Sequence, residues 1–157
     1  MSEKVSVVMA AYNGERYIEE SVRSILGQTL ENFEFIIVDD GSTDSTFNKL
    51  QQIGDPRLRI IRQGNQGQTS ALIAGIQQAK GDLIARLDDD DYSLPNRLMS
   101  QLKFMEAHPK VSLCGSRFQE LHRGRLVTQR VPFVQTNTEI KRIMSFYVKL
   151  YMELNSN

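Results

Sequence analysis

The alternation of short apolar runs with helix-like patterns is the feature that most limits how this chain can fold. Four runs have the pattern of strands buried on both faces. Between them, apolar residues recur at helical spacing, as at Ile18, Val22 and Ile25. Short connections join these elements in a β-α-β-α-β-α-β order, which predicts an α/β fold with a Rossmann-like, mostly parallel sheet flanked by helices. The predicted strands are 5–10, 33–38, 57–62 and a fourth that begins at Leu83.

The fourth predicted strand leads directly into four consecutive carboxylates at 88–91. Adjacent acids repel one another, and burying one of them unpaired is costly. If the strand pattern continues through them, Asp88 and Asp90 face one side and Asp89 faces the other. Carboxylate oxygens suit hard cations such as Mg²⁺ or Mn²⁺. The segment alone is therefore either a cation site or a solvated acidic loop that precedes a helix.

Polar residues follow three of the predicted strands where each strand ends. Tyr12 and Asn13 come after the first strand, Asp39 and Asp40 after the second, and the acids at 88–91 after the fourth. In parallel α/β sheets, ligands bind beyond the carboxyl ends of the strands. This convergence favours a ligand site over a solvated acidic loop.

The part of the chain beyond the acids is predicted to contain a helix, strands at 111–121 and 126–133, and a turn at 122–125. Further on, apolar residues form one stripe of an amphipathic helix. Such a stripe packs on a core, or it forms a self-association or membrane-facing surface. We expect a main domain at 1–133 and a terminal helical segment at 134–157, which permits a homodimer or peripheral association with a membrane.

Composition excludes several classes of function. The 157 residues suit one domain, and 19 basic side chains balance 19 acidic ones, so the net charge does not indicate nucleic-acid binding. The single cysteine, Cys114, excludes a disulfide framework within the chain, and His108 and His122 lack metal-ligand spacing. No run approaches the ~20 apolar residues of a membrane span, and no signal-peptide pattern is present, so we expect a cytoplasmic protein.

Three motifs in this order and spacing resemble those of the family-two glycosyltransferases. They are Val-Ser-Val-Val-Met-Ala-Ala-Tyr-Asn-Gly at 5–14, Ile-Val-Asp-Asp-Gly-Ser-Thr-Asp at 37–44, and Ala-Arg-Leu-Asp-Asp-Asp-Asp at 85–91 followed by Leu-Pro-Asn-Arg-Leu at 94–98. The resemblance extends to about residue 133 and implies the GT-A fold. It further implies transfer of a sugar, with inversion, from a nucleotide-diphosphate sugar (most commonly a UDP-sugar) to a saccharide or lipid-linked acceptor, as in polysaccharide biosynthesis.

The resemblance also implies a nucleotide site at the first two motifs. Ala11, Tyr12 and Asn13 are expected to lie beside the nucleoside, and Asp39 is expected to accept a hydrogen bond from the base. Asp40, its neighbour in the motif, belongs to the same expected site.

For the third motif, the resemblance implies a metal and a ribose contact. Asp90 is expected to hold an Mn²⁺ or Mg²⁺ ion that bridges the diphosphate, and Asp88 is expected to lie near the ribose and the metal. Asp89 occupies the variable middle position and is the alternative to Asp88 on the ribose side. Gly67 matches the family's glycine before the third helix.

The chain departs from the family pattern in two places. Ile73 stands where many members have asparagine. The family's catalytic base belongs to an acidic motif well downstream, and no matching motif follows Lys141, so the catalytic residue is unidentified; Glu139 and Glu153 on the predicted terminal helix are expected to be solvated. The chain resembles the donor-binding half alone. The alternative is therefore a nucleotide-binding module without transferase activity of its own.

Three other functions fit the residues less well. A nucleotidyltransferase normally has a glycine-rich loop with a basic residue after its first strand, and the segment 10–16 lacks one. A phosphoryl-accepting regulator would explain Asp39 and Asp40 but not the acids at 88–91. Dinucleotide binding is disfavoured because no G-x-G-x-x-G follows the first strand.

Overall fold

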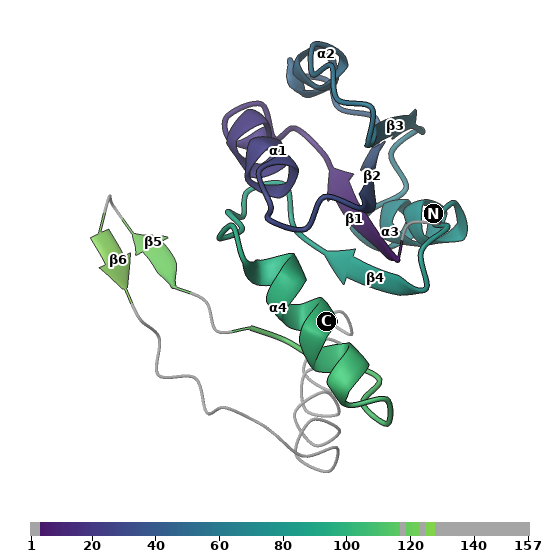
Figure 1. Ribbon diagram of the computed structural model, residues 1–157. Helices are drawn as coiled ribbons and strands as arrows, with labels where there is room; N and C mark the ends of the chain where they lie inside the picture. Colours follow the sequence, from purple (N-terminus) through teal and green to yellow (C-terminus); the bar gives the residue numbers. More distant parts are fainter. Residues whose placement is uncertain (1–3, 117–118, 123–124, 128–157) are drawn as a thin grey trace, which may run out of the picture. The chain divides into compact units, whose positions relative to one another are not determined.

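A four-stranded parallel sheet forms the centre of the first of two compact units. The computed structural model describes residues 4–116, 119–122 and 125–127 (Figure 1), and the units divide after Ser116. Each β-α-β connection brings the chain back to the end of the sheet at which the previous strand began. Every strand pair in this sheet is therefore parallel, as the sequence predicts. The strand order is β3-β2-β1-β4, with β1 (Val5–Ala11), β2 (Phe33–Asp39), β3 (Leu58–Arg62) and β4 (Leu83–Arg86).

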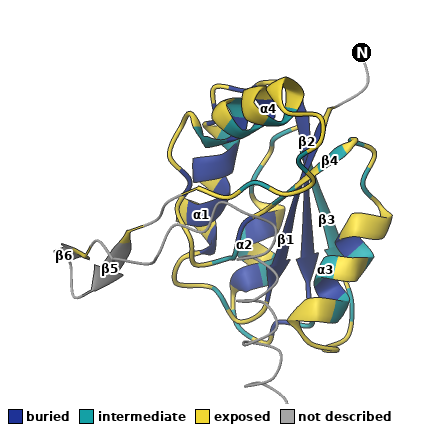
Figure 2. Ribbon diagram, turned by 90° about the horizontal axis from the view of Figure 1, so that it is seen from below, coloured by how far each residue is buried: buried dark blue, intermediate teal, exposed yellow. Residues whose placement is uncertain are grey.

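Helices cover both faces of this sheet. Every residue of β1 and β2 is buried, because alternate side chains meet helices on opposite faces (Figure 2). Val7 and Met9 belong to the cluster that contains the apolar residues of α1 and α4, whereas Ala10 packs in the cluster of α3. The helices are α1 (Ile18–Leu26), α2 (Thr46–Gln51), α3 (Gln68–Gln77) and α4 (Arg97–Ala107).

The close approach of α3 to the sheet depends on a glycine. A Cβ atom added at Gly75 would lie 2.6 Å from Cγ1 of Val8 and 3.3 Å from Cγ2 of Val38. No side chain fits at such a distance without displacement of the sheet or the helix. Gly75 is therefore required by packing, and it sets the distance between α3 and the strands that carry the first two motifs.

The strand order reverses between β1 and β4. The chain proceeds outward from β1 to β2 and β3, and α3 then returns it to the other side of β1, where β4 pairs (Figure 1). In open α/β sheets this reversal leaves a crevice at the carboxyl ends of the two diverging strands, which is where ligands bind. The first motif and the acidic motif thus lie on the two sides of this strand-order reversal.

The acids at 88–91 do not continue β4, which corrects the expectation of strand-like alternation. The strand ends at Arg86, and the chain then turns, with the amide of Asp91 donating to the carbonyl of Asp88 at 3.2 Å. Both faces of the sheet are covered by apolar layers, so charged side chains could not follow the strand pattern without being buried. The acids instead form a turn in which Asp90 and Asp91 are exposed.

The second unit contains a small antiparallel pair, β5 (Glu120–His122) and β6 (Arg125–Val127). The strand predicted at 111–121 begins later than expected, because Val111 donates to the carbonyl of His108 in the turn that ends α4. His122 and Arg125 pair with each other as strand residues rather than forming the predicted turn. The rest of the strand predicted at 126–133 and the predicted terminal helix lie outside the described residues.

No helix among the described residues has the length and apolar character to cross a membrane.

Candidate functional site

The carboxyl ends of three adjacent strands align the residues of the first two motifs. Ala11 of β1 is the register partner of Asp39 of β2, and Asp39 is in turn the register partner of Arg62 of β3. On the other side of β1, the backbone amide of Tyr12 donates to Oδ2 of Asp89 at 3.2 Å, across 77 residues of sequence. The sheet therefore brings the first, second and third motifs together at the carboxyl ends of its strands.

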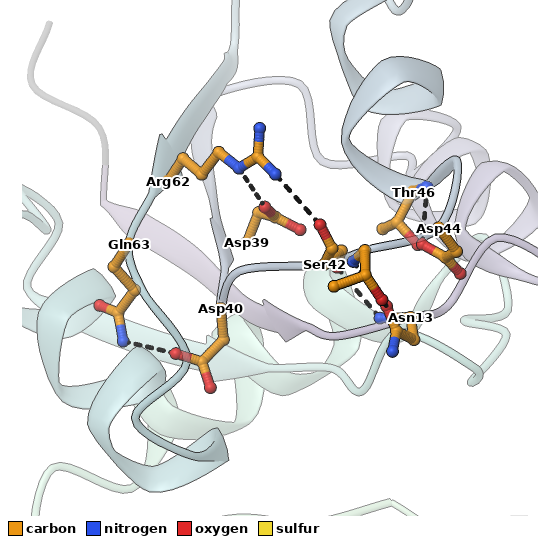
Figure 3. Close-up of polar contacts among 9 residues, drawn as sticks. Asn13, Asp39, Asp40, Ser42, Asp44, Thr46, Arg62 and Gln63 are labelled. Carbon is orange, nitrogen blue, oxygen red and sulfur yellow. Dashed lines mark hydrogen bonds and ion pairs between the residues drawn. The ribbon is translucent and has the colours of Figure 1, made fainter.

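The loop after β1 is tied to the loop after β2 by Asn13. Its backbone is left-handed (φ 52°), a conformation that asparagine tolerates better than most residues. Its amide donates to Oγ of Ser42 at 3.0 Å, and its Oδ1 accepts from the amide of Thr43 at 2.9 Å (Figure 3). The neighbouring residue Tyr12 is 48% exposed.

Asp39 is a fully buried carboxylate with unused hydrogen-bonding capacity. Nε of Arg62 lies 3.1 Å from its Oδ2 as an ion pair, but neither carboxylate oxygen accepts a hydrogen bond from the described residues (Figure 3). The approach of the guanidinium does not have hydrogen-bond geometry, although its Nη2 does donate to the carbonyl of Ser42 at 3.0 Å. A buried acceptor without a donor is costly, so this site suits a ligand that brings an N–H group.

Asp40 points away from Asp39 and supports the loop that precedes α3. Its carboxylate accepts from Nε2 of Gln63 at 2.7 Å (Figure 3). It also accepts from the amide of Gln66 at 2.9 Å and the amide of Gly67 at 2.7 Å. Burial favours the neutral acid, but these three hydrogen bonds outweigh it and hold the pKa of Asp40 below its ordinary value. The structure thus assigns Asp40 a structural contact, and it places Gly67 (φ 89°) at the start of α3.

The acidic turn gives its members different environments. Arg86 binds both oxygens of Asp88, with Nε and Nη2 each 3.0 Å from a carboxylate oxygen. The carboxylate of Asp90 is exposed and has no hydrogen-bond or ion-pair partner in the part of the chain that the structure describes. Burial, and then the charges of Asp88 and Asp90, raise the pKa of Asp91. Carboxylate oxygens are ligands that a hard divalent cation prefers, but no three potential metal ligands among the described residues are grouped closely enough to hold one by themselves. A cation here would need further oxygens from its ligand or from water.

Asp89 turns inward from the same loop. Its carboxylate accepts from Tyr12, and burial, together with the charges of Asp90 and Asp88, raises its pKa above the ordinary value despite that hydrogen bond. A Cβ atom added at Gly14 would lie 2.5 Å from Oδ2 of Asp89. Gly14 is therefore the residue that lets the acidic turn approach the loop after β1.

Sequence reasoning did not identify two residues that shape this site, Arg62 and Gly14. Arg62 is the last residue of its strand, so a parallel register with β2 would have placed it beside Asp39. No sequence signal identifies the role of Gly14, since its partner Asp89 is remote in the chain. Ala11 is buried beside Asp39 and accepts a hydrogen bond from the amide of Asp40.

Comparison with known proteins places these features in a family. The model of glycosyl transferase family 2 matches residues 6–151. An uncharacterized glycosyltransferase of Haemophilus influenzae is 39% identical over 115 residues, which cover 71% of this chain and 36% of that protein. The UDP-Glc:alpha-D-GlcNAc-diphosphoundecaprenol beta-1,3-glucosyltransferase WfaP of Escherichia coli is 41% identical over 105 residues, which cover 66% of this chain and 42% of that protein.

Solved structures show the same architecture. TarS 1-349 of S. aureus in complex with UDP-GlcNAc matches with a TM-score of 0.64 and 30% identity, over 68% of this chain and 32% of that one. The mannosyltransferase PcManGT of Pyrobaculum calidifontis, in complex with GDP-Man and Mn²⁺, matches with a TM-score of 0.64 and 25% identity, over 71% of this chain and 34% of that one. The chain thus spans less than half the length of these relatives. Its sheet has the GT-A fold, and the chain belongs to glycosyltransferase family 2.

Proposed function

We propose that this chain binds the donor of a metal-assisted, inverting glycosyltransferase, and that the donor is a UDP-sugar. The observation that carries the proposal is the hydrogen bond from the amide of Tyr12 to Asp89, which joins the first motif to the acidic motif at the strand-order reversal. The UDP-GlcNAc complex of TarS and the UDP-Glc in the name of WfaP support the choice of nucleotide.

The nucleoside is proposed to bind beyond β1 and β2. The exposed ring of Tyr12 offers a stacking surface, while Ala11 and Asn13 shape the loop beneath it. Asp39 is proposed to accept the N–H of the base, which would satisfy a carboxylate that lacks hydrogen bonds. Because Asp39 is buried, the half-exposed Arg62 side chain must turn aside for this contact. Asp40 and Gly67 act on the site through the loop before α3.

The diphosphate is proposed to lie over the acidic turn. Asp90 would hold Mn²⁺ or Mg²⁺, with Asp88 as a second ligand once Arg86 releases it and Asp89 facing the ribose. When bound, the cation would stabilise the negative charge that develops on the departing diphosphate. The complex of PcManGT with GDP-Man and Mn²⁺ supports the proposal that a divalent metal accompanies the donor.

Transfer also requires an acceptor and a base that takes the proton of the acceptor hydroxyl. We propose a saccharide or lipid-linked acceptor, as in polysaccharide biosynthesis, which the diphosphoundecaprenol in the name of WfaP supports. The proposed roles of Asp39, Asp40 and Asp88–Asp90 lie with the nucleobase, the loop before α3, the ribose and the metal, and none of them takes the acceptor proton. We therefore propose that this chain binds donor without efficient transfer. A cytoplasmic location, a homodimer and membrane association stay predictions.

Calorimetric titration with UDP and GDP, each with and without Mn²⁺, tests the donor site. We expect UDP to bind in a metal-dependent manner and Asp90→Ala to abolish the effect of the metal. Asp82→Ala is the matched control, because Asp82 is an exposed acid just before β4, at the opposite end of the strand. If neither UDP nor GDP binds, the proposal is contradicted.

Incubation of the purified chain with UDP-sugars and saccharide acceptors tests the second part. We expect UDP to be bound but no glycosylated product to form. Sustained transfer would show that a catalytic base is present after all.

A further inference from the structure

Three buried polar side chains from one segment hold the acidic turn by its backbone. Ser21 and Ser24 lie on α1, and Gln28 follows the end of that helix. Their exposed fractions are 2%, 6% and 5%, which is unusual for residues that pack beside an apolar core. We name these three residues the polar clamp.

The polar clamp is hydrogen-bonded to the chain on both sides of Asp90. On the N-terminal side, Oγ of Ser21 donates to the carbonyl of Asp89 at 2.9 Å. On the C-terminal side, Oγ of Ser24 accepts from the amide of Ser93 at 3.0 Å. The metal-ligand candidate therefore lies between two backbone positions that are bonded to α1.

Gln28 adds hydrogen bonds to the helix that follows the acidic turn. Its Nε2 donates to the carbonyl of Leu94 at 2.7 Å, and its Oε1 accepts from the amide of Leu98 at 3.0 Å. Leu98 lies in the first turn of α4, where backbone amides lack partners within the helix. Gln28 thus caps α4 from a distant segment and fixes where the acidic turn ends.

Arg97 connects the two ends of the acidic turn. Its Nε donates to Oγ of Ser93 at 2.7 Å, and its Nη1 donates to the carbonyl of Arg86 at 3.1 Å. The start and the end of the turn are therefore held together as well as being held to α1.

We propose that Ser21, Ser24 and Gln28 are positioning residues that set the geometry of the metal carboxylate Asp90. All three are buried and bonded to backbone groups, so they act through the backbone of the acidic turn. Metal sites lose affinity when the groups that orient their ligands are removed. The proposal rests on the proposed function, because it assumes that Asp90 binds a divalent cation together with the donor diphosphate.

The measurement that tests it is the metal enhancement, defined as the ratio of the UDP dissociation constants without and with Mn²⁺. Ser21→Ala removes one hydrogen bond to the acidic turn, and Gln28→Met keeps the side-chain length without its polar atoms. We expect each variant to lower the metal enhancement about fivefold and to leave the metal-free UDP affinity within about twofold. Ser21→Thr restores a hydroxyl and should recover the enhancement.

Ser6→Ala is the control for loss of a buried serine. Oγ of Ser6 donates to Glu34 at 2.6 Å near the amino end of β1, remote from the acidic turn. The Ser6→Ala variant should leave the metal enhancement unchanged, even if thermal unfolding shows that the variant is less stable. If the wild-type chain binds UDP without metal enhancement, the proposed metal site itself is wrong. If the enhancement is present and survives both clamp variants, or if metal-free affinity falls equally, the positioning role is overturned.

Discussion

Asp39 and Asp40 are adjacent in sequence, but they have different partners because successive side chains at a strand end point to opposite sides. Asp39 faces Arg62 and retains carboxylate oxygens without hydrogen bonds, whereas Asp40 accepts three hydrogen bonds from the loop before α3. One carboxylate is therefore available for a ligand, and the other is committed to the fold. Two substitutions can separate these roles.

Asp39→Asn is expected to weaken UDP binding about tenfold to a hundredfold, which corresponds to the loss of a hydrogen bond to a charged group. The amide keeps the shape of the side chain, but its oxygen is an uncharged and weaker acceptor and its NH2 group cannot accept, so the charge-assisted hydrogen bond to the base N–H is lost. Calorimetry measures the change, and Asp55→Asn serves as a control, because Asp55 pairs with Arg57 away from the crevice. Unchanged UDP affinity in Asp39→Asn would contradict the assigned contact.

Asp40→Asn is expected to lower the free energy of unfolding by about 1–3 kcal/mol at pH 7, because its amide group cannot accept from all three donors. The pKa of Asp40 is lowered in the folded state. Its contribution is therefore present above the ordinary aspartate pKa of about 4 and is lost as the pH falls through the lower folded value. Urea unfolding from pH 7 to pH 3 should show the two proteins converging in acid. A difference that stays constant with pH would argue against this role.

At the scale of elements, the spacing between α3 and the sheet decides whether the second motif and the loop before α3 meet. Gly75 permits that spacing, and Asp40 then joins β2 to the residues that begin α3. The helix carries no charged residue in its first or last turn and no side-chain cap at its N-cap residue, so packing rather than capping holds it. The position of α3 is therefore sensitive to the volume at this contact.

Gly75→Ala is expected to destabilise the protein by about 1 kcal/mol or more, because the cost of overpacking exceeds the gain in helix propensity. In a Val8→Ala background, the contact at 2.6 Å is gone and only the approach to Val38 at 3.3 Å remains, so the same substitution should cost less or become neutral. A double-mutant cycle from urea unfolding measures this coupling. Gly54→Ala is the control, since nothing lies within 4 Å of a Cβ atom there. Additive effects would show that Val8 does not limit the approach.

At the scale of the whole molecule, the candidate site belongs to no single element. Residues from the ends of β1, β2 and β4 form it, and α1 holds the acidic turn through the polar clamp. A ligand that contacts all of these segments binds only when they are assembled. Binding and stability of the folded chain are therefore linked.

UDP with Mn²⁺ at a hundredfold excess over the dissociation constant is expected to stabilise the fold by about 2.7 kcal/mol. Differential scanning calorimetry measures the corresponding rise in Tm. Asp90→Ala should show little of this rise with the same ligands, whereas Asp82→Ala should show all of it. An equal rise in Asp90→Ala would mean that the metal ion is held elsewhere.

The sequence alone determined the α/β class, the parallel sheet and the edge at which the polar residues gather. These features follow from local patterns, because apolar periodicity specifies each element and the carboxyl ends of parallel strands meet on one side. Among the described elements, the sequence predicts the bounds of the antiparallel pair least accurately. Val111 is held in the turn after α4, and the strand starts later than its apolar pattern suggests.

Only the tertiary structure decided what each acid contacts. The sequence could not predict that Asp40 supports a loop, that Arg86 engages Asp88, or that the polar clamp grips the chain around Asp90. These contacts join residues through strand register, turn geometry and helix packing, which depend on the whole chain closing on itself. A carboxylate's role follows from the donors that surround it, and those donors come together only in the folded molecule.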